Sequence, residues 1–518
     1  MIRFLINIPP PVHLLLLVLI PILRLPGFDG NFLLEEESFY LLLGQSIAGD
    51  AQLYADAWFT GPPIMIWIYA FFFQLFGEGA LLAIRIFACF YIYLTAAYFN
   101  GILADYKLFR KNVNLTSITF VFLVSVPWHG QQFSASLFVL LPIIFSFASL
   151  LELGDDRQKN YRIMFRVGFW MMIAIMASYK VVFILIGIAF AYIFLKKARL
   201  DELVSLLGGM LSVVGGMVLI LYLSGILGDW WDIGLVSYLD RVVLKSIENP
   251  ELASMTVMQI WISYLPAILL LSAIGFMHFR LRFYSYVTKV RSIEMIMAVW
   301  LVGILFALAF KFKRLDLTDF ILLVPPIVFY TAKTFDFKWV YRLRYILLIG
   351  ILVVPFYSYM SYLGIRFPQT FSLFHPAEDA LLLHGGQLGI LNREAPIYSL
   401  QNQEKGEQLW VMEFNPKLYV ALGYHCANRY TDYRIAYYKI PALPGASDRI
   451  FSKRETDREV YEQFRKNPPD IVLDRNEDFP LLQARYPQLL GNYQKRELEG
   501  FSVYELNKQG PKTSASLK

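Results

Sequence analysis

The chain has 518 residues, of which 57% are hydrophobic and only 17% are Asp, Glu, Lys or Arg. A typical soluble domain carries about 25% of these charged residues. A wholly water-soluble protein is therefore excluded, because it could not cover so much apolar surface. The net charge of +6 is not gathered into a basic stripe, which argues against a nucleic-acid partner.

The charged residues divide the chain into two parts. Residues 1–364 hold 27 of the 47 Lys and Arg and 22 of the 41 Asp and Glu, about 13% of that part. Residues 365–518 hold the other 20 and 19, about 25%, which is the value of a soluble domain. We therefore predict a membrane-embedded domain over 1–364 and a soluble domain over 365–518.

Apolar runs of about 20 residues mark spanning helices. In chain order, the sequence predicts eleven of them, at 5–26, 80–104, 114–127, 133–152, 163–179, 181–195, 204–224, 257–277, 292–310, 318–334 and 345–363. A further apolar run, Pro62–Phe76, is interpreted as a helix on the membrane surface. This choice places 18 Lys and Arg of the loops inside and six outside, as the positive-inside rule requires.

The resulting topology has a cytoplasmic N-terminus and a soluble domain that is periplasmic or extracellular, in a bacterial inner membrane. That domain alternates short apolar runs with polar turns, which predicts an α/β fold. The predicted strands are Ile397–Leu400, Leu409–Met412, Asp470–Leu473 and Phe501–Leu506, and a polar helix is predicted near Thr456–Lys466.

An acidic segment follows the first predicted span. Glu36 and Tyr40 lie one helical turn apart and would share a polar face. The adjacent carboxylates of Glu35, Glu36 and Glu37 lie near a low-dielectric boundary and repel one another. At least one of them should therefore have a raised pKa and could deprotonate a hydroxyl group. The alternative is a solvated acidic turn. The apolar residues of the segment, Phe39, Leu42, Leu43 and Ile47, are predicted to lie on lipid.

Three cations, Lys311, Lys313 and Arg314, lie in a predicted outer turn, where the topology disfavours positive charge. They predict an anionic partner at that depth, such as a lipid phosphate. The alternative is that they reach the headgroups of the outer leaflet. Lys180 and Arg85, near outer helix ends, have the same two interpretations.

No cofactor is predicted. The six histidines are far apart in sequence, so a divalent metal is conceivable on isolated carboxylates but has no supporting ligand cluster. The sequence has no Walker-type loop and no Gly-x-Ser-x-Gly motif, which weakens nucleotide-driven transport and serine hydrolysis as functions.

The order of these motifs resembles the GT-C superfamily of membrane glycosyltransferases, in particular the bacterial relatives of protein O-mannosyltransferases and of the lipid A aminoarabinose transferase. The segments similar to family motifs are Glu36-Glu37-Ser38-Phe39-Tyr40 for Asp-Glu-x-x-Tyr, Gly49-Asp50 for Gly-Asp, Leu53-Tyr54-Ala55-Asp56 for Tyr-x-Asp, Pro62-Pro63 for Pro-Pro, and Phe76-Gly77 followed by Arg85. Lys180 and the turn at Arg314 also have family counterparts. Two positions depart: Glu36 replaces an Asp, and Gly61 replaces a Lys.

The resemblance implies a fold and an activity. The protein would move a sugar from a polyprenyl-phosphate-linked donor to a hydroxyl of a glycan, lipid or protein on the outer face of the membrane. It implies Glu36, Glu37 and Asp56 as catalytic residues, with Glu36 as the base and Asp56 as a supporting acid. The implied substrate-binding residues are Tyr40, Arg85, Lys180, Lys311, Lys313 and Arg314.

Two other functions compete with this interpretation. A lipid or glycan transporter also needs a charged membrane cavity, but it favours internal repeats and broken helices at matched positions, and neither is evident. A membrane anchor for the soluble domain would not need eleven spans.

The predicted topology has a direct test. A reporter enzyme that is active only outside the cytoplasm, fused after Lys518, should be active, because the charge asymmetry places this end outside. A reporter that works only in the cytoplasm should be silent at the same position, and activity of that second fusion would refute the topology.

Overall fold

The protein is described from a computed structural model. The described residues are 10–28, 35–57, 59, 61–105, 113–125, 130–153, 157–187, 200–236, 297–301, 303–304 and 321–335. In the soluble domain they are 408–411, 422, 425–426, 465, 468–474, 479–480, 483, 487, 492–498 and 501–507.

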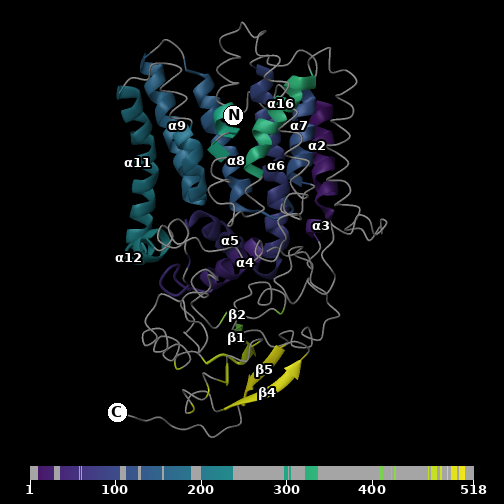
Figure 1. Cartoon of the computed structure of the whole chain (residues 1–518), viewed down its shortest axis with the longest axis vertical. Coiled ribbons are helices and arrows are strands. Elements are labelled where there is room, and N and C mark those ends of the chain that lie inside the picture. Colours follow the sequence, from purple (N-terminus) through teal and green to yellow (C-terminus); the bar gives the residue numbers. More distant parts are fainter. Residues whose placement is uncertain are drawn as a thin grey trace.

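Upright helices form the part of the chain that is predicted to lie in the membrane (Figure 1). They are α2 (Pro10–Leu23), α6 (Ala80–Asp105), α7 (Val113–Ser125), α8 (Ala135–Leu151), α9 (Arg157–Ala177), α11 (Leu200–Leu223) and α16 (Val324–Phe335). Each overlaps a predicted span. The predicted spans 257–277 and 345–363 lie outside the described residues, and 181–195 and 292–310 are described only in part.

Two helical stretches of the described chain are long and apolar enough to cross a membrane, Ile64–Asp105 and Leu200–Leu223. The outward face of α11 carries large apolar side chains, and Leu211 is 66% exposed. The outward face of α2 is similar, with Leu14, Leu17 and Val18 exposed. Apolar faces of this extent are unfavourable in water, which supports lipid contact on both helices.

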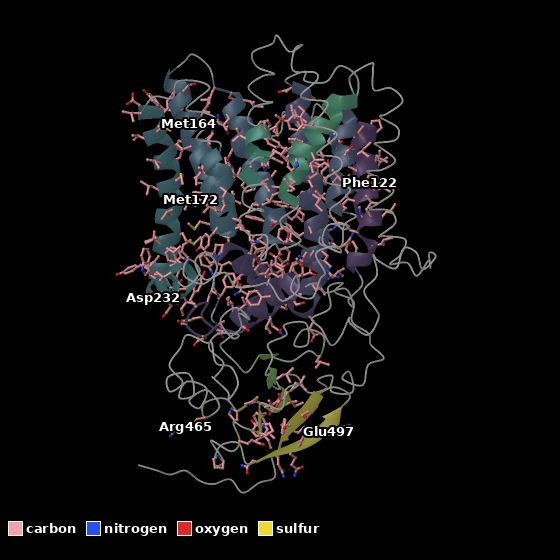
Figure 2. All side chains as sticks on the ribbon, in the orientation of Figure 1. Phe122, Met164, Met172, Asp232, Arg465 and Glu497 are labelled. Carbon is pink, nitrogen blue, oxygen red and sulfur yellow. The ribbon has the colours of Figure 1, made fainter. Side chains whose placement is uncertain are left out.

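Short helices gather at one end of the upright helices, between them and the sheet (Figure 1). They are α3 (Leu25–Phe28), α4 (Glu35–Ala48), α5 (Ile64–Phe76), α12 (Leu227–Asp229) and the π-helix η4 (Trp230–Val236). Figure 2 shows Asp232 of η4 at this end, whereas Met164 and Met172 of α9 lie along the upright part. The segment that contains the acidic residues therefore lies at the end of the bundle nearest the soluble domain.

The prediction that the apolar face of the acidic segment lies on lipid was wrong. Phe39, Leu42 and Leu43 are buried, because α4 packs against α5. The two helices meet closely at Gly44, where a Cβ atom would lie 2.8 Å from the Cβ of Tyr69. The apolar residues of α4 thus form part of the protein core, and they fix how the acidic residues are turned.

The described part of residues 365–518 contains a mixed sheet. Its strands are β1 (Gln408–Val411), β2 (His425–Cys426), β3 (Ile471–Asp474), β4 (Tyr493–Leu498) and β5 (Phe501–Leu506), in the order β2-β1-β3-β5-β4. The neighbours β2, β1 and β3 run parallel, whereas β3, β5 and β4 are antiparallel. Strand β2, at one edge of this sheet, lies beside α4.

Three of the predicted strands coincide with β1, β3 and β5. Strand β4 was not predicted because its sequence, YQKREL, is almost entirely polar, as suits a strand at the edge of a sheet. Strand β2 is too short to give a pattern. The predicted strand Ile397–Leu400 lies outside the described residues, as does the predicted helix Thr456–Lys466 apart from Arg465.

Glycines allow α9 and α11 to touch through their backbones. A Cβ atom on Gly168 would lie 2.0 Å from the carbonyl oxygen of Leu206, and one on Gly209 would lie 2.1 Å from that of Phe165. Small residues commonly permit such close helix packing in membranes.

We expect Gly209→Ala to destabilise the protein by about 1–3 kcal/mol, because the added methyl group must push the two helices apart. The matched control is Gly216→Ala on the same helix, where a Cβ atom would have no neighbour within 4 Å. Thermal unfolding in detergent should show a lower midpoint for the first variant only. Equal midpoints would contradict the close packing.

Candidate active site

A buried ion pair joins α4 to α6. The Arg85 Nη2 atom donates to the Glu37 Oε2 atom at 2.8 Å, and Arg85 Nε lies 3.4 Å from Glu37 Oε1. The two residues are only 2% and 1% exposed. Arg85 also donates to the carbonyl oxygen of Gly27. Because both carboxylate oxygens of Glu37 face the guanidinium group, this contact is bidentate, the strongest form of such a pair.

A second buried arginine fastens the turn at 130–133 to the end of α2. Arg24 donates to the carbonyl oxygens of Gly130 and, at 2.5 Å, of Gln131. The Gln131 side chain accepts from the Gly27 N–H at 3.2 Å and donates to the Leu23 carbonyl oxygen at 3.0 Å. These contacts satisfy polar groups at a helix end that water cannot reach, and they hold the turn against α3.

Glu36 lies at the edge of this buried network. The Tyr40 hydroxyl donates to its Oε1 atom at 3.2 Å, and the Gln132 Nε2 atom donates to its Oε2 atom at 3.4 Å. The pairing of Glu36 with Tyr40, predicted from their spacing, is therefore present. Glu36 is partly exposed, whereas Glu37 is buried. Of the two adjacent carboxylates, Glu36 is the one that can meet a substrate.

Tyr69 of α5 is the common neighbour of the charged groups. Its hydroxyl donates to the Phe133 carbonyl oxygen at 2.8 Å, and its ring packs on that of Tyr40 with the centroids 5.5 Å apart. The Tyr69 hydroxyl interacts electrostatically with two carboxylates and two guanidinium groups, those of Glu37, Glu36, Arg85 and Arg24. The cluster is thus electrically balanced when both carboxylates are ionised.

Asp56 occupies a different environment from the glutamates. It is exposed, and its Oδ2 atom accepts from the backbone N–H of Gln52 at 2.9 Å, within its own loop. Backbone φ angles of 72° at Asp50 and 70° at Tyr54 mark this loop as tightly turned. The described contacts of Asp56 therefore cap its own turn and do not join it to Glu36.

The same loop explains the glycine that departs from the family pattern. The Tyr54 hydroxyl donates to the Gly61 carbonyl oxygen at 2.7 Å, and burial raises the pKa of Tyr54 well above its usual value, so it stays a neutral hydroxyl. A Cβ atom on Gly61 would lie 2.5 Å from the ring of Phe59. A lysine at position 61 would displace that ring.

Lys180 follows a residue, Tyr179, that interacts with this loop. It belongs to the 3₁₀ helix η3 (Tyr179–Val181) and is partly exposed. Its neighbour Tyr179 interacts with Tyr54, and Gly234 of η4 also lies against the Tyr54 ring. The predicted phosphate-binding residues Lys311, Lys313 and Arg314 lie outside the described residues.

No group of three metal-ligand side chains occurs among the residues that the structure describes. The idea of a divalent ion on isolated carboxylates therefore stays a prediction.

Sequence reasoning missed Arg24, Tyr69, Gln131 and Gln132. One signal was available for the glutamines: two consecutive amides between two apolar helices would need buried partners if the turn were packed inside the protein. Arg24 ends an apolar run, and only the contact with the turn at 130–133 distinguishes it from an arginine at a membrane interface.

We expect Arg85→Met to destabilise the protein by about 3–5 kcal/mol, because it leaves the Glu37 carboxylate buried without its partner. The matched control is the ion pair of Arg166 and Glu152, which has a similar length of 2.7 Å but side chains 48% and 37% exposed. Arg166→Met should change stability by less than about 1 kcal/mol. Denaturation midpoints that fall equally would contradict this assignment.

Comparison with known proteins gives the fold. Neither a protein-family model nor a curated protein sequence matches the chain. The crystal structure of ArnT from Cupriavidus metallidurans bound to undecaprenyl phosphate is similar, with a TM-score of 0.57 and 11% identity over 96% of this chain and 99% of that one. The apo structure of the same protein has a TM-score of 0.54 and 13% identity, over 95% and 97%. The chain therefore shares the fold of ArnT, in agreement with the resemblance seen in its motifs.

Proposed function

We propose that the protein is a membrane glycosyltransferase that moves a sugar from a polyprenyl-phosphate-linked donor to a hydroxyl group of a glycan, lipid or protein acceptor. The observation that carries the proposal is the exposure and orientation of the Glu36 side chain. It is a partly exposed carboxylate held by two hydrogen bonds at the end of the helical bundle nearest the soluble domain. A group so placed can accept a proton from an acceptor hydroxyl.

The buried ion pair favours Glu36 over Glu37 as the base. Both oxygens of Glu37 are directed at Arg85, so proton transfer to Glu37 would break a buried salt bridge. Glu36 accepts its described hydrogen bonds from a neutral hydroxyl and a neutral amide. These two contacts orient the carboxylate without neutralising it by a buried cation, unlike the contact of Arg85 with Glu37.

The phosphate leaving group would be stabilised by positively charged side chains. In this proposal Lys180 and the turn of Lys311, Lys313 and Arg314 bind the departing polyprenyl phosphate, since cations aimed at developing negative charge lower the barrier of such a displacement. The fold supports this, because ArnT of the same fold has been crystallised with undecaprenyl phosphate. In this proposal Arg85 does not bind the phosphate, because it is paired with Glu37 inside the protein.

A lipid or glycan transporter stays the second candidate. It would need the charged residues for binding or for proton coupling, and it would not deprotonate an acceptor hydroxyl. The side chain of Glu36, oriented by Tyr40 and Gln132, favours the enzyme.

The test compares sugar transfer and binding of the isolated lipid-linked sugar donor in nanodiscs. We expect Glu36→Gln to reduce kcat by about 10²-fold or more with donor affinity retained, because the amide keeps the size but loses the basicity. Glu36→Asp should retain partial activity. Arg314→Ala should instead weaken donor binding, because a charge-assisted contact with phosphate contributes about 1.5–3 kcal/mol.

Arg241→Ala is the control for Arg314→Ala, since it removes a cation from another predicted outer loop. Transfer at the parental rate by the Glu36→Gln variant would refute the assigned base. Donor binding and export without any transfer would favour the transporter.

A further inference from the structure

We propose that Gln132 is the positioning residue of this site: it orients the Glu36 carboxylate by tying it to the backbone of Glu37. The inference rests on the proposed function, in which Glu36 is the base. It concerns a residue 96 positions away in sequence that touches no charged group other than Glu36 in the described contacts.

The side-chain amide of Gln132 makes two hydrogen bonds, each to a different partner. Its Oε1 atom accepts from the Glu37 backbone N–H at 3.2 Å, and its Nε2 atom donates to Glu36 Oε2 at 3.4 Å. The first contact assigns the amide orientation, because only an oxygen can accept from a backbone N–H. The nitrogen must then face the carboxylate, as observed.

The position of Gln132 is itself rigidly fixed. Its side chain is 1% exposed, and the preceding residues are held by Arg24 through the carbonyl oxygens of Gly130 and Gln131. On the other side, the Phe133 carbonyl oxygen accepts from the Tyr69 hydroxyl. A reacting group held from a locked, buried turn keeps its geometry through the reaction, which is what a positioning residue supplies.

Tyr40 completes the arrangement from within α4. Its hydroxyl holds the Oε1 atom of Glu36, while Gln132 holds the Oε2 atom. Tyr40 belongs to the same helix as Glu36, whereas Gln132 brings a contact from a separate segment, the turn at 130–133.

The test uses substitutions that distinguish the hydrogen bond to Glu37 from the hydrogen bond to Glu36. Gln132→Glu keeps an oxygen that can accept from the Glu37 N–H but loses the N–H₂ that faces Glu36. Gln132→Met removes both hydrogen bonds and keeps a side chain of nearly the same length. We expect each to lower kcat by about tenfold or more with the affinity for the lipid-linked sugar donor unchanged. Both should also lower the thermal unfolding midpoint, Gln132→Met because it removes both hydrogen bonds and Gln132→Glu because it buries a carboxylate beside Glu36 and Glu37.

A double-mutant cycle with Glu36→Gln distinguishes positioning from a general loss of structure. If Gln132 acts through the Glu36 carboxylate, Gln132→Glu should cost no further activity in the Glu36→Gln background. The matched control is Gln131→Leu, an adjacent buried glutamine, whose effect should be the same in both backgrounds. Full multiplication of the Gln132→Glu and Glu36→Gln losses, or an unchanged kcat in both Gln132 variants, would overturn the inference.

A second readout does not depend on transfer. A hydrophobic carbodiimide labels protonated carboxyl groups, so the labelling of Glu36 at neutral pH, followed by mass spectrometry, reports on its hydrogen bonding. We expect labelling to be several-fold faster in Gln132→Glu and unchanged in Gly209→Ala, which perturbs the packing of α9 on α11 instead. If Glu36→Gln transfers sugar normally, the assignment of Glu36 as the base fails, while the labelling still decides whether Gln132 holds Glu36. Equal labelling in all variants overturns the inference even if Glu36 is the base.

Discussion

A carboxylate and a guanidinium group withdrawn from water are tolerated only when they meet with good geometry, and the contact of Glu37 with Arg85 meets this condition. It joins residues 48 positions apart and pins the first turn of α4 to α6. The Arg85 contact with the Gly27 carbonyl oxygen adds α3 to the same point. Because these segments are fixed, the side chain of Glu36, which precedes Glu37 in α4, is directed away from the buried ion pair.

The consequence is a division of roles between two adjacent glutamates. Successive helical residues are turned by about 100°, so if one side chain enters the core the next is directed elsewhere. Glu37 holds the structure together, and Glu36 is left at the boundary, where Tyr40 and Gln132 contact it. Of these two adjacent glutamates, Glu37 therefore has a structural role and Glu36 is available for chemistry, although the sequence alone makes the two appear equivalent.

Much of this could be predicted from sequence, for physical reasons that are clear. Helical periodicity placed Glu36 beside Tyr40, and apolar length placed the upright helices. The lipid-facing orientation of Phe39 and Leu43 was wrong because periodicity identifies an apolar face but not what covers it, and here α5 does. The partners of Glu36 from the turn at 130–133 could not be predicted, since a contact across 96 residues depends on how helices pack.

The replacement of the family's leading Asp by Glu36 can now be given a physical meaning. The longer arm of Glu36 brings its two oxygens to different partners, one on its own helix and one on the locked turn. A shorter aspartate would reach less far from α4, so Glu36→Asp should weaken the contact with Gln132 more than the contact with Tyr40. If so, the partial activity expected of Glu36→Asp should depend less on Gln132 than the activity of the parent does. Gln132→Glu should accordingly reduce kcat by a smaller factor in the Glu36→Asp background than in the parent, and an equal factor would mean that the length of the arm is immaterial.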